Sequence, residues 1–459
     1  MKKVFLILFI LLTNLTIYAE DISGKWNGIL NAQATTQLRL VFNITKTENG
    51  YSATMDSPDQ GAKGITITYT NYVNSILKLE ISNAGIRYEG TLDNNNTFVG
   101  TFKQGGHSFP LVLTKKEIEK VKISRPQEPT KPYPYYSEEV IFENTKDKIE
   151  LAGTLTLPKK NGVFPAVILI SGSGPQNRNE ELLGHKPFLV LSDYLTKNGI
   201  AVLRFDDRGT AKSSGNFEAA TTFDFANDVE FAIEYLQTRK EINKNKIGLI
   251  GHSEGGIIAP IIASENRDIA FIVLMAGSSL RGDKLLLLQK YKIETQMAIN
   301  KELIDKNQQI FAGAYEFILN ENIKKEELSD TLSNYFKSNY GKALPVNQMN
   351  SIINQLTSDW MVNFMRLDPV MYLKKVTCPI LAINGNKDLQ VPSKENIEII
   401  ENIFKTSKNK NVKTKELKGL NHLFQECKTG AISEYATIEQ TISPIALKEI
   451  LDWINIQVK

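Results

Sequence analysis

Up to about residue 118, apolar and polar positions alternate in short runs. Runs such as LRLVFNIT, GITITYTN and IRYEGTL are rich in Val, Ile, Thr and Tyr, and Asn, Asp and Gly residues separate them. Alternation over a few residues between turns is typical of strands with one buried face. The pattern predicts an antiparallel β-barrel or sandwich over residues 20–118.

From residue 137 to residue 459 the apolar positions form continuous runs instead. AVILISGSG, IAVLRFDD, KIGLIGHS, IAFIVLMAG and PILAINGNKD alternate with helical patterns such as DFANDVEFAIEYLQTRK. This alternation indicates a mostly parallel sheet, buried on both faces by helices. Over about residues 280–372, amphipathic helical patterns follow one another without a strand. We expect that insertion to form a helical cap over the carboxyl edge of the sheet, where such folds bind ligands.

Two segments lie outside these patterns. Residues 1–19 combine two lysines, an apolar run and a small residue, Ala19. This is the arrangement of a signal peptide, and the apolar run is shorter than the roughly 20 residues of a membrane-spanning helix. We therefore expect export to the periplasm or the medium, without stable membrane insertion after cleavage.

Residues 119–136 are rich in proline and predict an extended linker between two domains.

Length and composition narrow the function classes. At 459 residues the chain is longer than a single hydrophobic core usually supports, which favours two domains. The formal charge of +3 is small for this length and gives no sign of nucleic-acid binding. The two cysteines, Cys378 and Cys427, could form one bridge in an exported protein or remain separate buried thiols.

The stretch KIGLIGHSEGGIIAP places Ser253 in a Gly-x-Ser-x-Gly motif. Small residues at a strand-to-helix turn also suit plain packing, so the motif alone does not identify a nucleophile. Here a buried strand precedes the turn and a helix of small residues follows it, which is the setting of a nucleophile elbow. Gly251 and Gly255 would let the strand and the helix approach closely, and the helix N-terminus favours negative charge.

A serine nucleophile needs a histidine as its base. His422 follows the strand-like segment NVKTKEL, in a polar loop at the expected carboxyl edge of the sheet. The other histidines lie in the β domain, at the start of the first helix of the sheet and inside the elbow, where the side chain points away from Ser253: His107, His185 and His252. His422 is therefore the predicted base.

The base needs a carboxylate that orients it. Asp388 lies in the loop directly after the apolar run PILAING, between Ser253 and His422 in the chain. Glu395 is the second candidate, but it begins the next helix, where an acidic residue is expected for the helix itself. The predicted order is Ser253, Asp388, His422, which is the order of the α/β-hydrolase triad.

Residues from about 138 to 459 resemble the α/β-hydrolases, in particular bacterial serine esterases related to the dienelactone hydrolase and prolyl oligopeptidase branches. ISGSGPQNRNE, DDRGTAKSSG and SDWMVNFMRLDP resemble, in that order, the Gly-Ser-Gly-Pro-x-x-Arg, Asp-x-Arg-Gly and Trp-x-x-x-Phe-x-x-x-Asp-Pro segments of those esterases. The resemblance implies an α/β-hydrolase fold with a helical cap. The opening SGKWNG resembles the first strand of lipocalin-like barrels, in which Trp26 would plug one end.

The resemblance also implies roles for residues around the triad. The backbone N–H groups of Ser173 and Glu254 would form the oxyanion hole, with Gly174 beside the first of them. The loop residues Arg178, Asp206 and Arg208 would contribute a buried ion pair that supports the oxyanion loop.

Two aromatic residues of the predicted cap stand four positions apart. The spacing of Trp360 and Phe364 indicates first of all a packed helix face. The general apolar character of ligand pockets makes both residues candidates to line an acyl pocket as well.

Together these residues predict an exported serine hydrolase that cleaves small carboxylic esters through an acyl-enzyme on Ser253. Such chemistry requires no metal or organic cofactor. An acyl-thioesterase or a serine peptidase would use the same triad. A protein that binds a lipid or a glycan through the barrel, with an inactive hydrolase scaffold, is the alternative outside enzymes. The loop GSGP lacks the lysine of a P-loop, which argues against a nucleotide site.

Overall fold

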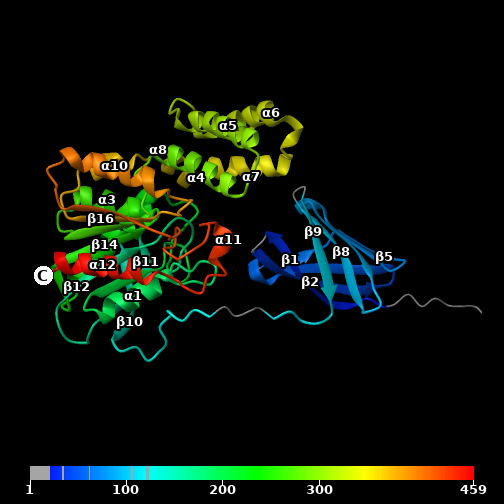
Figure 1. Cartoon of the computed structure of the whole chain (residues 1–459), viewed down its shortest axis with the longest axis horizontal. Coiled ribbons are helices and arrows are strands. Elements are labelled where there is room, and N and C mark those ends of the chain that lie inside the picture. Colours follow the sequence, from blue (N-terminus) through cyan, green and yellow to red (C-terminus); the bar gives the residue numbers. More distant parts are fainter. Residues whose placement is uncertain (1–20, 34–35, 61, 105–106, 120–123) are drawn as a thin grey trace, which may run out of the picture. The chain divides into compact units, whose positions relative to one another are not determined.

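The computed structural model describes residues 21–33, 36–60, 62–104, 107–119 and 124–459. The predicted signal peptide, residues 1–19, lies outside the described residues. The chain divides into two compact units, residues 1–122 and 123–459. Figure 1 shows an all-β unit in blue and cyan and a larger unit of sheet and helices in green to red. No helix of the described part is long and apolar enough to cross a membrane.

The first unit is an antiparallel sheet of nine described strands, in the order β4-β3-β2-β1-β9-β8-β7-β6-β5. The strands are β1 (Gly24–Gln33), β2 (Thr36–Thr47), β3 (Gly50–Ser57), β4 (Ala62–Thr66), β5 (Tyr69–Val73), β6 (Ile76–Ile81), β7 (Ile86–Leu92), β8 (Thr97–Gln104) and β9 (His107–Thr114), with short 3-10 turns at Pro58–Gln60 and Ser82–Ala84. Successive strands β4 and β5 occupy opposite edges, so the sheet curls until its edges approach. The link between them bonds to both sides: Ile67 N donates to Ala53 O at 3.1 Å and Thr68 N to Glu80 O at 2.7 Å. The predicted barrel-like β domain is confirmed.

The interior of this unit is filled by side chains from alternate positions of the strands. Trp26 is 0% exposed, and its ring packs edge-on against Phe98 with 4.6 Å between the ring centroids. Its indole N–H donates to Ile22 O at 2.7 Å, which satisfies the one polar atom of the side chain. Trp26 is therefore a core residue of the barrel.

The second unit is built on a sheet of eight described strands, in the order β10-β11-β13-β12-β14-β15-β16-β17. The strands are β10 (Tyr136–Asn144), β11 (Ile149–Leu157), β12 (Phe164–Ile170), β13 (Ala201–Phe205), β14 (Ile242–His252), β15 (Phe271–Met275), β16 (Ile380–Gly385) and β17 (Val412–Leu417). β10, β11 and β13 pair antiparallel, and all pairs from β13 to β17 are parallel. The carboxyl ends of β12 to β17 therefore meet at one edge of the sheet.

Helices cover both faces of this sheet. The helices are α1 (Pro187–Lys197), α2 (Thr222–Thr238), α3 (Gly255–Glu265), α10 (Ser393–Thr406) and α12 (Pro444–Gln457), with the short α11 (Ile432–Tyr435) in a loop. Alternate residues of β12 face opposite sides: Ile168 joins the core under α2, α3 and α10, and Val167 joins the core under α1 and α12. Because both faces of each central strand are buried, the strands are continuous apolar runs.

The helical cap lies between β15 and β16. It comprises α4 (Gly282–Gln296), α5 (Lys301–Leu319), α6 (Lys325–Tyr340), a 3-10 turn (Gly341–Ala343), α7 (Val346–Leu356), α8 (Asp359–Arg366) and α9 (Pro369–Leu373). The cap has a core of its own, around Ile318, Leu332 and Phe336. The predicted fold class, a mostly parallel sheet with helices on both faces and a helical cap, is confirmed.

The later part of the predicted linker is fixed to the second unit by specific hydrogen bonds. Arg125 donates to Gly184 O at 3.1 Å and to Ala436 O at 2.9 Å. The amide of Gln127 donates to Ile442 O at 2.7 Å and accepts from Thr441 N at 2.7 Å and Ile442 N at 3.1 Å. These residues brace the segment that follows the loop of His422.

Replacing Gln127 by alanine should destabilise the second unit. Gln127→Ala leaves three partly buried main-chain groups without their partner, and an unsatisfied buried group costs about 1–3 kcal/mol. We expect the free energy of unfolding, measured by urea denaturation, to fall by about that amount. Gln348→Ala, at an exposed position of α7, is the matched control and should change it by less than about 0.5 kcal/mol. Equal losses in both variants would show that residue 127 has no bracing role.

Candidate active site

Ser253 occupies a strained turn between β14 and α3. Its φ is 52°, a left-handed conformation that a residue other than glycine seldom adopts. The flanking glycines allow the turn. A Cβ on Gly251 would lie 1.9 Å from Gly255 O, and a Cβ on Gly255 would lie 2.1 Å from Ile170 O. The sequence motif therefore forms a nucleophile elbow, with a half-buried Ser253 at its tip.

The loop after β12 lies against this elbow. A Cβ on Gly172 would be 3.1 Å from the Cβ of Ser253. Gly172 N is occupied, because it donates to Glu180 Oε1 at 2.8 Å. Within the described chain, the backbone N–H groups of Ser173 and Glu254 donate to no protein acceptor. These are the two N–H groups that the sequence predicts as oxyanion donors. Gly174, the neighbour predicted to bind substrate, has a φ of 94°, which favours glycine.

Asp388 and His422 meet at the carboxyl edge of the sheet, after β16 and β17. The Nδ1–H of His422 donates to Asp388 Oδ2 at 2.7 Å, and the two side chains are 6% and 0% exposed. Asp388 Oδ1 accepts from Gln390 N at 2.8 Å and Val391 N at 2.9 Å. The carboxylate is thus held by three N–H groups, and it orients His422 so that Nε2 carries no hydrogen bond to a described residue.

The second candidate acid lies elsewhere. Glu395 begins α10, and its nearest cation is Lys292 of the cap, at 3.5 Å. His185 is also committed to other contacts, because its ring nitrogens lie 3.0 Å from Thr441 Oγ1 and 2.8 Å from Tyr435 O. Burial lowers the pKa of His185 below its ordinary value, more than the Tyr435 carbonyl raises it. His185 therefore braces the segment around Tyr435 and Thr441, and Glu395 links α10 to α4 of the cap.

The structure places two more ionisable residues, His252 and Glu180, beside His422. His252 Nδ1 lies 2.8 Å from Glu180 Oε1, and Nε2 lies 2.9 Å from the main-chain oxygen of His422. The rings of His252 and His422 are 4.8 Å apart. The sequence predicts that His252 points away from Ser253 but gives no sign of its partners, because Glu180 lies in a distant loop.

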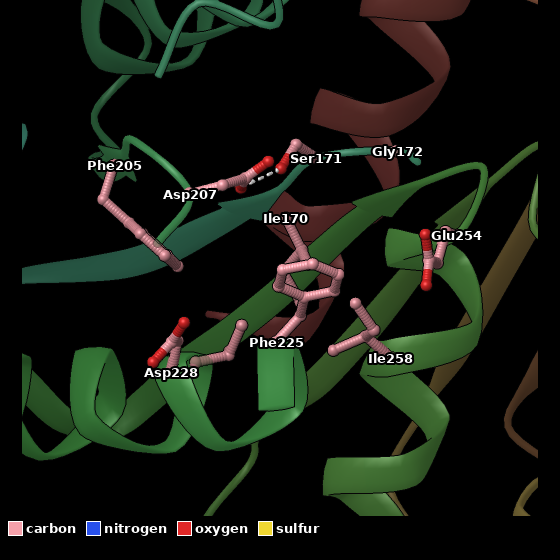
Figure 2. Close-up of a pocket in the computed structure, with 10 residues that line it drawn as sticks. Ile170, Ser171, Gly172, Phe205, Asp207, Phe225, Asp228, Glu254 and Ile258 are labelled. Carbon is pink, nitrogen blue, oxygen red and sulfur yellow. Dashed lines mark hydrogen bonds between the residues drawn. The ribbon is translucent and has the colours of Figure 1, made fainter. Parts of the chain in front are cut away.

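The carboxyl group of Asp207, which is half-buried, holds the predicted oxyanion loop at two points. It accepts from Ser171 Oγ at 2.6 Å and from Gln176 N at 2.9 Å. Burial raises the pKa of Asp207 to about 8, with the charges of Glu180 and Glu254 adding to it and the two hydrogen bonds opposing it. Figure 2 shows the bond between Ser171 and Asp207 beside a small cavity. That cavity has about 10 Å³ of room for the centre of a water molecule, which suits a single water and not an acyl chain.

The side chain of Glu254 connects the elbow to the cap. Glu254 Oε1 accepts from Thr222 Oγ1 at 2.6 Å and from the indole N–H of Trp360 at 2.9 Å. Burial raises the pKa of Glu254, although both hydrogen bonds act in the opposite direction. Trp360 in turn stacks on Phe364 with 5.0 Å between the ring centroids. The two rings therefore pack together on one face of α8, as their spacing predicts, and Trp360 also bonds to the elbow.

The conspicuous arginines belong to two separate ion-pair networks. Arg178 donates to Asp206 through Nε at 3.0 Å, Nη2 at 2.7 Å and its backbone N at 2.7 Å. Burial alone would raise the pKa of Asp206, but Arg178 outweighs it and lowers the pKa. Arg208 pairs instead with Asp228, at 2.7 Å through Nε. The pair that ties down the oxyanion loop is thus Arg178 with Asp206.

Both cysteines are free thiols in the structure. Burial raises the pKa of Cys378 to about 12 and raises that of Cys427 as well. Within the described residues, no group of three or more His, Cys, Asp or Glu side chains has the arrangement of a metal site. The chemical groups of the site are therefore a hydroxyl, an imidazole and carboxylates.

Comparison with known proteins assigns the family. The sequence model of the α/β-hydrolase family described as "Serine aminopeptidase, S33" matches residues 187–426, which is more than half of the chain. The chain belongs to this family. The matched segment contains Ser253, Asp388 and His422, and it begins after the oxyanion loop.

Individual relatives of this chain include an esterase and an acyl transferase. Esterase EstD of Thermotoga maritima is 24% identical over 277 residues, which are 60% of this chain and 58% of EstD. An acyl transferase of Shewanella woodyi is 31% identical over 137 residues, or 30% of this chain and 42% of that protein. The hydrolase thus spans less than two thirds of the length of these relatives.

Solved structures similar to this chain include an esterase and Est1E. The Pyrococcus furiosus esterase Pf2001 has a TM-score of 0.44 and 16% identity, and the match covers 74% of this chain and 100% of Pf2001. Est1E of Butyrivibrio proteoclasticus, solved with ferulic acid, has a TM-score of 0.41 and 16% identity, and the match covers 70% of this chain and 99% of Est1E.

The carboxyl group of Asp207 predicts a pH-dependent stability. Its pKa is raised from 3.8 to about 8 in the folded chain, so between these values only the unfolded chain releases the proton. The stabilisation is complete below pH 3.8 and is lost as the pH rises towards 8. Asp207→Asn mimics the protonated acid and removes this dependence. In thermal unfolding, we expect the Tm of the variant minus the Tm of the original protein to increase from pH 5 to pH 9. A difference that stays constant would contradict the raised pKa of Asp207.

Proposed function

We propose that residues 137–459 hydrolyse carboxylic esters through an acyl-enzyme on Ser253. Ser253 Oγ attacks the ester carbonyl while His422 Nε2 takes its proton. The tetrahedral intermediate collapses, and the leaving alkoxide receives that proton from His422. A water molecule, deprotonated in turn by His422, then attacks the acyl-enzyme and releases the acid and the free Ser253 hydroxyl.

The observation that carries this proposal is the placement of complementary groups around the elbow. Asp388 holds Nδ1 of His422 at 2.7 Å, so Nε2 is the nitrogen left to act as the base. The backbone N–H groups of Ser173 and Glu254 flank the elbow without a protein acceptor. Each such donor contributes roughly 3–4 kcal/mol to stabilising a tetrahedral oxyanion. A scaffold without activity would gain nothing from the strain at Ser253.

The name of EstD supports an ester as the substrate. The family description supports a second candidate, an aminopeptidase, because an amide differs from an ester only in the leaving group. A thioester would also suit the same triad. We place the small-molecule carboxylic ester first because the full set of residues for acyl transfer is present and EstD matches 60% of this chain.

We further propose that the protein works outside the cytoplasm, as residues 1–19 suggest. The β unit precedes the hydrolase unit in the exported chain. Its interior is filled by residues such as Trp26 and Phe98, which favours a supporting role over a lipid-binding one for that interior.

Removing the proposed acid of the triad should abolish turnover without unfolding the protein. Asp388→Asn keeps the size of the side chain but no longer fixes the tautomer of His422, and kcat on a nitrophenyl ester should fall by about 10⁴-fold. Glu395→Gln is the matched control, since Glu395 is the other acid near this position in the chain, and it should retain kcat within about twofold. If Glu395→Gln lost as much activity as Asp388→Asn, the triad would be wrongly assigned.

The leaving group is tested by comparing substrates that share one acyl group. We expect kcat/KM of the full-length protein to be highest for the alkyl ester, lower for the acyl-thioester and lowest for the aminoacyl amide. All three rates should vanish together in Ser253→Ala. Faster cleavage of the aminoacyl amide than of the ester would identify a peptidase instead.

A further inference from the structure

His252 is the buried histidine directly before Ser253, and the proposed reaction does not use it. Both of its ring nitrogens face oxygen atoms. Nδ1 lies 2.8 Å from Glu180 Oε1, and Nε2 lies 2.9 Å from His422 O. Both distances are those of good hydrogen bonds.

The two contacts together indicate how many protons the ring of His252 carries. A main-chain oxygen only accepts hydrogen bonds, so His252 Nε2 must carry a proton. Glu180 Oε1 also accepts from Gly172 N at 2.8 Å, and an ionised Glu180 has only acceptor oxygens, so beside it Nδ1 carries a proton as well. A neutral imidazole has one donor and one acceptor, and only the imidazolium donates from both nitrogens.

We propose that His252 is a permanent buried imidazolium, paired with Glu180, and that it is the positioning residue which holds the oxyanion loop and the His422 loop on the nucleophile elbow. The positioning role rests on the proposed function, whereas the protonation state does not.

The surroundings of His252 fit a charged ring. Burial alone would lower the pKa of His252, but the charge and hydrogen bond of Glu180, the His422 carbonyl and the charge of Asp388 outweigh it and raise the pKa. The other rings against it are His422, at 4.8 Å, and Phe424, at 6.3 Å. Glu180 Oε2 is buried without a hydrogen-bond partner among the described residues. Both described hydrogen bonds of this side chain therefore go to Oε1.

The pair connects the three segments that the reaction needs. Glu180 Oε1 bonds to Gly172, the neighbour of the proposed donor Ser173. His252 is the neighbour of Ser253 in the elbow. Its second N–H holds the backbone of His422 itself. One charged hydrogen-bonded pair therefore sets the relative positions of the oxyanion donor, the nucleophile and the base.

Charge balance explains why both partners are needed. During the reaction His422 becomes positive, with its ring 4.8 Å from that of His252. The carboxylate of Glu180 neutralises His252 and so limits the repulsion between the two rings. In Glu180→Gln, His252 loses its charged partner, so it releases a proton and donates from only one ring nitrogen. The site is weakened while the shape of the side chain at position 180 is preserved.

The protonation state can be read directly by NMR of the full-length protein labelled in its histidine ring nitrogens. The chain has only four histidines, and His252→Gln assigns the resonance. At about pH 8, where a histidine of ordinary pKa is only about 3% charged, His252 should show two protonated ring nitrogens. Glu180→Gln should remove this signature. A His252 with one protonated nitrogen in the original protein would overturn the proposal.

The positioning role is tested by kinetics on the same ester. Glu180→Gln should lower kcat by about 10- to 100-fold with less than about a threefold change in KM, because displaced reacting groups slow the chemical step. Glu181→Gln, the exposed neighbouring glutamate, is the control and should leave kcat unchanged. If Glu180→Gln retained full kcat, the positioning role would be refuted. If the original protein cleaved no ester, the proposed function would fail, and the NMR result would still decide the state of His252.

Discussion

The close packing of α3 against the ends of β12 and β14 is the constraint on which the whole site depends. A single Cβ at Gly255 would come within 2.1 Å of Ile170 O, so the helix can start this close to the sheet only with glycine there. That approach places the oxyanion loop beside Ser253 and leaves the Glu254 N–H free. The same approach accompanies the left-handed conformation of Ser253. The burial of the strands on both sides of β14 offsets the free energy that this strained conformation costs.

Four carboxyl groups around this elbow have different partners. Asp388 accepts hydrogen bonds from His422 and two backbone N–H groups. Glu180 is matched by His252. Asp207 and Glu254 have no cationic partner in their described hydrogen bonds, and burial raises the pKa of each. Burial thus shifts the two carboxyl groups without a cationic partner towards the neutral form. This shift keeps the net charge of a dry site low.

The chain order and the hydrophobic pattern predict the fold and the three proposed catalytic positions. Continuous apolar runs identify the central strands because these are buried on both faces, and Asp388 stands out because it directly follows such a strand. His422 stands out because its loop follows the strand-like segment NVKTKEL. His252 and Glu180 escape this reasoning, since their pairing joins loops 72 residues apart and leaves no periodic signal. Gln127 escapes it for a similar reason. A proline-rich segment predicts a linker, and only the three-dimensional structure shows the hydrogen bonds of Gln127 to Thr441 and Ile442.

The measurement that tests the central claim most directly is covalent labelling with a fluorophosphonate, followed by mass mapping of the digested protein. The account predicts one adduct per chain, on the peptide that contains Ser253, and no adduct in Ser253→Ala. Labelling of another serine, such as Ser171 in the neighbouring loop, or a folded protein that takes up no label, would contradict it.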